Sequence, residues 1–386
     1  FITTNTGAVV TGICTATSFS GSGEGLTRTT QYSHRNVIVN GACLVAERGT
    51  SSASTDYGSV DRMKMTTANL DQLAFLQKQT NDGPDGFKKC FEFDVTTPEN
   101  ALDADDLVYM RYLVERRDLV PFFNANGTGK NFTLSFYVKA YQTGTYQVAI
   151  YKSQGPRFIA RTYTIASSGV WQRVVLNFPG DTNTSGMDAV NSTGFQISWI
   201  FAAGTNYTSG STQTTWGSWP GNPGFAAGHA VNVASSANNY WRITGIQLEV
   251  GDIATPFEHK SFAEELARCQ RYFQVLSRNT SAGLNQHSRY PALGNGTNST
   301  LWYCYHKQTM RVRPSLVKSN ITSTTVEIFN YSISNGATYG GSSMSEGDEN
   351  HSQITVTTLN NVSTAHIACW RFSNNADCYW AVDAEL

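Results

Sequence analysis

One stretch of this chain, from Tyr240 to Phe273, changes its hydrophobic period partway along, and that change constrains the fold more than any other feature. The first part alternates as a half-buried strand does, with apolar residues at Trp241, Ile243, Ile246, Leu248 and Val250. Gly245 interrupts the alternation, which predicts a β-bulge, and Gly251 marks the end of the strand. The stretch therefore begins as a strand that closes a sheet.

The second part of the stretch has the period of a short amphipathic helix. Ser261 is followed three residues later by Glu264, a spacing typical of a capping box. Four apolar residues then share one helical stripe: Phe262, Leu266, Cys269 and Phe273. A helix of about 12 residues is too short to be stable alone, so the stripe must pack on something. It could cap one sandwich or line the three-fold axis of a trimer, and in either case we expect a junction between two β domains.

Composition limits the class of protein and its partners. Charged residues make up only 15% of the 386 residues and there are 33 glycines, a balance that favours an all-β protein with many short strands. The net charge is −1 without a sustained basic run, which argues against a nucleic acid or an anionic membrane as partner. No apolar run approaches the ~18 residues that a membrane-spanning helix needs.

Successive strands are predicted along most of the chain. The segments of one group are 90–95, 107–114, 132–138, 146–151, 171–178 and 195–201. Their spacing and Gly-rich turns suit a sandwich rather than βαβ units. A second group, at 301–305, 310–316, 325–331, 354–359, 366–372 and 378–386, predicts a further β-sandwich at the end of the chain.

The sequence contains no nucleophile elbow, phosphate loop, dinucleotide fingerprint or HExxH helix. Its seven cysteines are scattered, without a CxxC pair or a zinc-ligand spacing. We interpret them as buried free thiols, in keeping with assembly in a reducing cytoplasm.

Several segments together resemble one group of viral proteins. The opening stretch reads WRITGIQLEVGDIATPFE from Trp241 and EELARCQRY from Glu264, and upstream NVIVNG begins at Asn36, ERGT at Glu47 and YGSVDR at Tyr57. This order resembles a jelly-roll module found in tail-fibre and other virion proteins of tailed bacteriophages, over roughly residues 35–273. Met63 departs from it, because Trp is usual there. Residues 15–27 resemble a fibre-shaft element in which three chains wrap together, with a flexible linker as the alternative, and the ending DAEL resembles that of fibre-tip domains.

The resemblance implies an organisation in four parts. These are a stem remnant over residues 1–34, a jelly-roll domain of the carbohydrate-binding type over 35–258, a linking helix over 259–273 and a β-sandwich tip over 274–386. A homotrimer in the virion is implied, assembled in the host cytoplasm, joined to other tail proteins through its N-terminal part and belonging to a longer polypeptide. Phe262, Leu266, Cys269 and Phe273 would form the trimer interface.

The implied function is attachment to a glycan or protein receptor on the host surface, without enzymatic activity. Polar segments at 283–299 and 334–352 of the tip are the expected receptor-reading loops. Two alternatives remain open: a head fibre or capsid decoration built from the same modules, and a depolymerase that cuts surface polysaccharide. The enzyme is disfavoured because such depolymerases are built on a long β-helix with paired carboxylates, whereas charge is sparse here.

The loop from Ala202 to His229 is the competing receptor site. It carries four aromatic residues among Gly, Ser, Thr and Asn: Tyr207, Trp216, Trp219 and Phe225. Flat rings beside amides and hydroxyls suit a sugar, whose CH groups stack while its OH groups hydrogen-bond. The other interpretation is structural, because so long a loop must bury its aromatic residues somewhere.

Three carboxylates lie close together in the sequence at Asp103, Asp105 and Asp106. Acidic side chains and carbonyls are the ligands that Ca²⁺ prefers, so this cluster could help to hold a calcium ion. The alternative is a solvated turn between two strands. We expect no other cofactor.

Overall fold

The computed structural model describes residues 34–279, 290–294, 299–319, 326–330, 333–358, 367–372 and 378–386, together with two short strands near the start. The chain divides into two compact units, Phe1–Arg35 and Asn36–Leu386. In the first unit β1 (Ile2–Thr4) pairs antiparallel with β2 (Gly7–Val9). Residues 10–33 of the predicted stem, including the shaft-like element at 15–27, lie outside the described residues.

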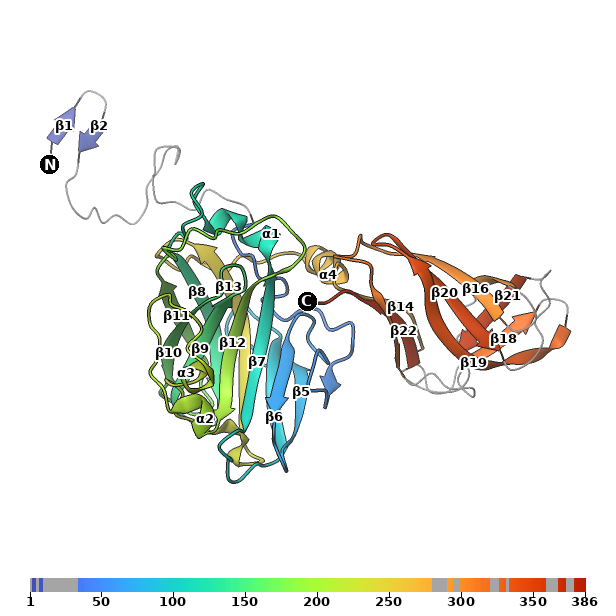
Figure 1. Ribbon diagram of the computed structural model, residues 1–386, viewed down its shortest axis with the longest axis horizontal. Helices are drawn as coiled ribbons and strands as arrows, with labels where there is room; N and C mark the ends of the chain where they lie inside the picture. Colours follow the sequence, from blue (N-terminus) through green and yellow to red (C-terminus); the bar gives the residue numbers. More distant parts are fainter. Residues whose placement is uncertain are drawn as a thin grey trace. The chain divides into compact units, whose positions relative to one another are not determined.

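Two antiparallel sheets pack face to face in the second unit (Figure 1). The first has five strands in the order β10 (Arg157–Ile165), β9 (Gly144–Lys152), β12 (Thr193–Ala203), β7 (Leu107–Glu115) and β4 (Lys64–Ala68). The second has six, in the order β11 (Gln172–Phe178), β8 (Phe132–Ala140), β13 (Tyr240–Val250), β6 (Cys90–Thr97), β5 (Ala74–Thr80) and β3 (Ser51–Ser52). Between β7 and β8 lie α1 (Arg116–Leu119) and η1 (Val120–Phe122), and η2 (Val233–Ser235) precedes β13. The predicted all-β jelly-roll class is confirmed.

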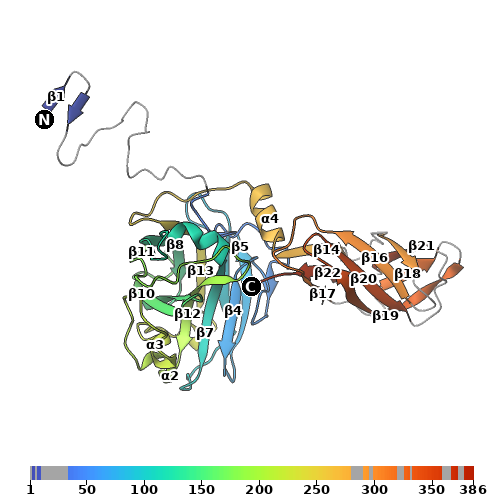
Figure 2. The ribbon, with the colours of Figure 1, turned by 45° about the horizontal axis from the view of Figure 1, so that its top comes forward.

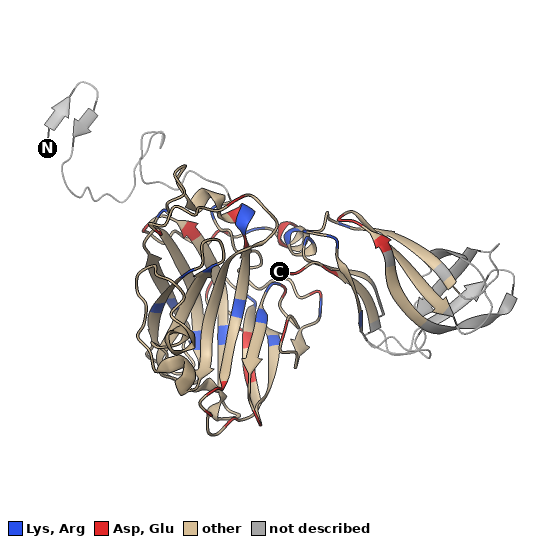
Figure 3. Ribbon diagram, viewed as in Figure 1, with Lys and Arg blue, Asp and Glu red and all other residues tan. Residues whose placement is uncertain are grey.

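The core lies between the two sheets because each strand turns alternate side chains inward. Phe201 of β12 and Trp241 of β13 come from opposite sheets, and their ring centroids are 4.7 Å apart. Trp199 of β12 lies edge-on to Phe136 of β8 at 5.9 Å. Charged residues occupy only small parts of this ribbon (Figure 3), as the composition implies.

The bulge predicted at Gly245 is present in β13. The register of β13 against β8 shifts between Thr244 and Gln247, and Gly245 has φ +62°. A Cβ at this position would lie 2.8 Å from the ring of Phe87, so both the backbone conformation and the space require glycine.

The linking helix is α4 (Phe262–Gln270), and Figure 2 shows it beside β14. The Oγ of Ser261 accepts a hydrogen bond from the backbone N–H of Glu264 at 3.2 Å, as the capping spacing predicts. The helix is shorter than expected, because the chain is already extended at Phe273, the first residue of β14 (Phe273–Asn279).

The last part of the chain departs from the predicted sandwich. One three-stranded sheet has the order β14, β22 (Cys378–Asp383) and β17 (Ser315–Ser319). The other strands close into a barrel in the order β15 (Tyr290–Gly294), β16 (Ser299–Tyr305), β20 (His351–Thr358), β19 (Ile333–Gly347), β18 (Val326–Asn330) and β21 (Ile367–Phe372). Closure follows because β21 pairs with both β15 and β18, which leaves the ring without an edge.

The prediction of a receptor-reading loop at 334–352 is wrong, because most of this segment belongs to strand β19. This strand pairs on both sides, with β18 and with β20, so its Gly- and Ser-rich backbone is satisfied inside the barrel wall. Much of the other predicted loop, at 283–299, lies outside the described residues. Across the part of the chain that the structure describes, no helix is long and apolar enough to cross a membrane.

Candidate functional site

The outward face of the five-stranded sheet carries rows of side chains that meet through strand register. One row crosses all five strands: Lys64, Arg111, Ser198, Ala149 and Ala160. The neighbouring row holds Leu113, Gln196, Tyr151 and Phe158. Their sequence neighbours, such as Met110 and Ile197, are buried in the core between the sheets, so these rows face outward.

The aromatic loop after β12 folds over part of this face. It contains two short helices, α2 (Thr205–Thr208) and α3 (Asn222–Phe225), and is less irregular than the sequence suggests. Phe225 packs in a second apolar cluster with Tyr109 and Ile200 of the sheet. The Nε2 of Gln147 donates to the carbonyl of Phe225 at 2.6 Å, which ties the loop to β9.

A pocket of about 330 Å³ lies where the loop meets the sheet. It is lined by Arg111, Ala149, Tyr151, Phe158, Gln196, Ser198, Trp219 and Phe225. The indole of Trp219 stands perpendicular to the rings of Tyr151 and Phe158, with centroids 5.8 and 5.3 Å away. Because 42% of Trp219 is exposed, part of its ring is open to a ligand. The small side chains of Ala149 and Ser198 leave space in this pocket.

The four predicted aromatic residues have different environments. Trp219 and Phe225 line the pocket, whereas Tyr207 packs at the edge of the second apolar cluster. Trp216 packs against the main core, and its Nε1 donates to the carbonyl of Pro179 at 2.7 Å. Trp216 therefore anchors the loop, as the structural interpretation expected.

Sequence reasoning missed the part of the pocket that the sheet supplies. Arg111, Gln196 and Ser198 are outward positions of strands that were predicted, and their alternation was the available signal. Phe158 lies in β10, which was not predicted, since two arginines interrupt its apolar pattern. One of them, Arg157, is accommodated by Asp181, which it meets at 3.2 Å.

The three aspartates of the predicted calcium cluster do not converge. Asp103 and Asp105 are exposed, while Asp106 is buried and its Oδ2 accepts from the backbone N–H of Asp103 at 2.8 Å. Burial and the nearby carboxylates raise the pKa of Asp106. No group of three or more His, Cys, Asp or Glu side chains that could hold a metal ion occurs among the described residues. Calcium binding stays a prediction.

The predicted helical stripe is largely used within one chain. Cys269 and Phe273 are fully buried, and Leu266 packs with Leu386 on a cluster around Val39. Phe262 is 58% exposed, so it is the member most open to another copy. Cys43, Cys90, Cys269 and Cys304 are buried free thiols, and burial raises the pKa of Cys90 to about 11.

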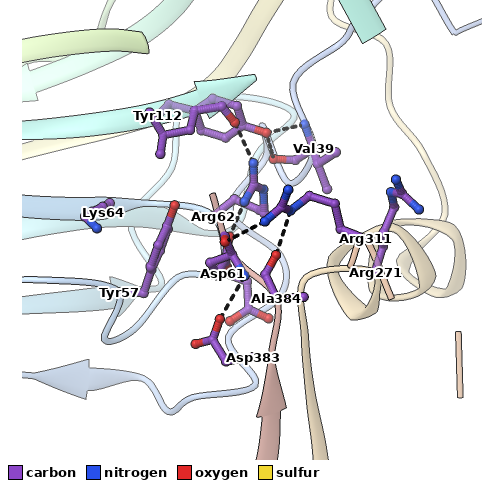
Figure 4. A network of polar contacts seen from close by, with 12 residues as sticks. Val39, Tyr57, Asp61, Arg62, Lys64, Tyr112, Arg271, Arg311, Asp383 and Ala384 are labelled. Atoms are coloured by element: carbon purple, nitrogen blue, oxygen red, sulfur yellow. Dashed lines mark hydrogen bonds and ion pairs between the residues drawn. The ribbon is translucent and has the colours of Figure 1, made fainter. Parts of the chain in front are cut away.

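A buried ionic network joins the end of the chain to the jelly roll (Figure 4). Arg62 is 1% exposed and pairs with the carboxylate of Glu385, and its guanidinium lies 3.5 Å from the ring centroid of Tyr272. Arg48 meets the carboxylates of Asp383 at 2.9 Å and Glu385 at 3.3 Å. Burial alone would lower the pKa of Arg62, but Glu385 holds it well above its ordinary value.

Other bonds hold the same segment in place. Arg311 donates to the carbonyls of Ala384 at 2.7 Å and Glu385 at 3.0 Å. Burial raises the pKa of Asp61 to about 7, against the opposing effect of Arg48. Beside the network lies a polar cavity of about 600 Å³, whose lining includes Tyr57 and Lys64.

When the chain is compared with known proteins, similarity is found to solved structures. No protein-family model matches the chain, and no curated protein sequence matches it. A bacteriophage CBA120 tailspike protein 4 domain, described as enzymatically active, is similar at 11% identity over 56% of this chain and 22% of that one, with a TM-score of 0.31. TmCBM61 in complex with β-1,4-galactotriose is similar at 12% identity over 56% of this chain and 99% of that one, with a TM-score of 0.25.

A family 11 carbohydrate-binding module from Clostridium thermocellum, solved with a mixed-linked tetrasaccharide, is similar at 11% identity over 53% of this chain and 98% of that one, with a TM-score of 0.27. The likeness to the tailspike spans less than a quarter of that protein's chain. At TM-scores of this size, the jelly-roll assignment rests on the strand order and register described above.

Proposed function

We propose that this chain attaches a tailed-phage particle to its host by binding a surface glycan in the pocket between Trp219 and the five-stranded sheet. The observation that carries the proposal is the half-open indole of Trp219 in a pocket whose lining includes the small residues Ala149 and Ser198. Such a ring can stack on the CH face of a sugar. Gln196 and Ser198 supply amide and hydroxyl groups in the lining for its hydroxyls, and the volume lies at the low end for ligand pockets.

A binding role is supported over a hydrolytic one by the chemistry of the lining. A glycosidase needs two carboxyl groups on either side of the scissile bond. No Asp or Glu is among the described residues that line this pocket. Release of reducing sugar from host polysaccharide by the purified protein would contradict the proposal.

The proposed position of the chain on the particle is supported by the sequence motifs that resemble those of fibre proteins. As a homotrimer joined to other tail proteins, the chain would present three copies of a shallow site. Three linked sites can convert weak individual sugar contacts into firm attachment, so no deep pocket is needed. Electron microscopy of labelled particles tests this placement, and a position on the capsid would favour the decoration role instead.

The binding site is tested with Trp219→Ala on the intact chain. We expect loss of binding to host cells and to a glycan array, with the fold retained because Trp219 is 42% exposed and lies outside the main core. Tyr141→Ala is the matched control, since Tyr141 is 49% exposed on the same domain and does not line the pocket. Undiminished binding by the Trp219 variant would refute the site.

A further inference from the structure

The pocket contains one charged side chain, and that charge has no counter-ion among the described residues. Arg111 is the sole charged residue of the lining. In the described part of the chain it forms no ion pair, and its one hydrogen bond is donated by Nη2 to the hydroxyl of Tyr109. The guanidinium lies 5.0 Å from the ring centroid of Tyr109, which holds it over the sheet.

The Nε–H of Arg111 is a buried donor that lacks a partner. Because this nitrogen is closed to solvent, the donors that a ligand in the pocket can reach are the other N–H groups of the guanidinium. A guanidinium offers five N–H donors in a planar arrangement, so the bond to Tyr109 leaves most of its capacity unused.

The neighbouring cation, Lys64, has a counter-ion in the described part of the chain, unlike Arg111. Lys64 lies opposite Arg111 in the same row of the sheet, but its Nζ pairs with Asp56 at 2.9 Å and lies 5.1 Å from the ring centroid of Tyr57. The other residues of this row are Ser198, Ala149 and Ala160, which carry no charge. The middle of the sheet face is therefore positive.

We propose that the pocket selects an acidic saccharide, with the carboxylate of a uronic or similar sugar acid bound by the guanidinium of Arg111. This inference rests on the proposed glycan-binding function and names the substrate class for that site. The planar guanidinium matches a carboxylate in a two-point arrangement that a lysine cannot reproduce. Trp219 and Tyr151 then contact the apolar face of the ring, while Gln196 and Ser198 bond its hydroxyls.

The first test needs no variant. Isothermal titration compares a tetrasaccharide containing glucuronic acid with its carboxyl-reduced counterpart, in which only the charged group differs. We expect the acidic form to bind about tenfold to a hundredfold more tightly, the range for hydrogen bonds to charged groups. Raising the salt concentration should weaken the acidic form alone. Equal affinity for the two sugars, or tighter binding of a phosphorylated form of the neutral sugar, would overturn the assignment.

Variants then distinguish the role of the Arg111 charge from glycan binding by the pocket as a whole. Arg111→Gln should remove the preference and keep the affinity for the neutral sugar, whereas Arg111→Lys should keep part of the preference. Arg173→Gln is the matched control, because Arg173 is an exposed strand arginine on the other sheet. A preference that survives in Arg111→Gln would refute the role of Arg111. If neither sugar binds, or Trp219→Ala leaves binding of both unchanged, the proposed function itself fails.

Discussion

Removing one carboxylate at the end of the chain should destabilise the jelly roll. Glu385→Ala leaves the guanidinium of Arg62 buried without its partner, because Arg62 is 1% and Glu385 5% exposed at the side chain. Breaking a buried ion pair from one side costs about 3–5 kcal/mol. In this variant Arg62 keeps its hydrogen bond to the carbonyl of Leu113 and its cation–π contact with the ring of Tyr272. We therefore expect a loss of about 3 kcal/mol in the free energy of unfolding, at the lower end of that range.

The assay is urea unfolding of the full chain followed by tryptophan fluorescence. Calorimetry shows whether one transition or two are involved, because a single unfolding free energy requires two-state behaviour. Glu349→Ala is the control: Glu349 is exposed and should change stability by less than about 0.5 kcal/mol. The double variant Arg62→Met with Glu385→Leu should recover most of the loss, since a buried ion pair can be replaced by apolar residues at little cost.

Two results would refute this reasoning. A loss below about 1 kcal/mol in Glu385→Ala would mean that water or another group compensates Arg62. A double variant as unstable as the single one would show that the cost comes from lost packing of the terminal segment rather than from an unpaired charge.

Three further predictions concern the jelly roll itself. Lys152→Met should cost about 3 kcal/mol in urea unfolding, because it strips one cation from Asp181, which is 1% exposed, while an isosteric change at an exposed lysine should cost little. Burial lowers the pKa of His229 to about 4, so the imidazole of the unfolded chain takes up its proton at a higher pH than that of the folded chain. The contribution of His229 to the free energy of unfolding should be complete above about pH 6.5 and fall by about 3 kcal/mol toward pH 4. Parallel curves of stability against pH for wild type and His229→Gln would contradict this. Trp216→Ala should lower the melting temperature clearly more than Trp219→Ala, because Trp216 packs on the core; equal melting temperatures would contradict the anchoring role.

Local signals in the sequence were sufficient for several of the elements. The bulge at Gly245 and the cap at Ser261 depend on the chemistry of a few adjacent residues, and both are present. Alternation also placed most of the jelly-roll strands. It missed β10, where Arg157 is paired with Asp181, a residue distant in sequence.

The pocket and the barrel could not be predicted because both depend on pairing between distant strands. Arg111 and Ser198 face each other only through the register of β7 and β12. Trp216 and Trp219 are three residues apart with the same composition around them, yet one is an anchor and the other a pocket wall. Closure of the barrel likewise depends on the pairing of β21 with both β15 and β18.

The terminal network also changes how the receptor site should be located. Arg62 lies two residues before the start of β4 and bonds to the carbonyl of Leu113 on β7, and β7 carries Arg111 two residues before Leu113. The end of the chain is therefore tied to one of the strands that form the pocket. A chain ending near Gln274 would lack Glu385 and leave Arg62 unpaired, so its loss of binding would follow from either a missing tip site or a disturbed sheet. Only point variants at the pocket, with the terminal residues in place, can distinguish the two.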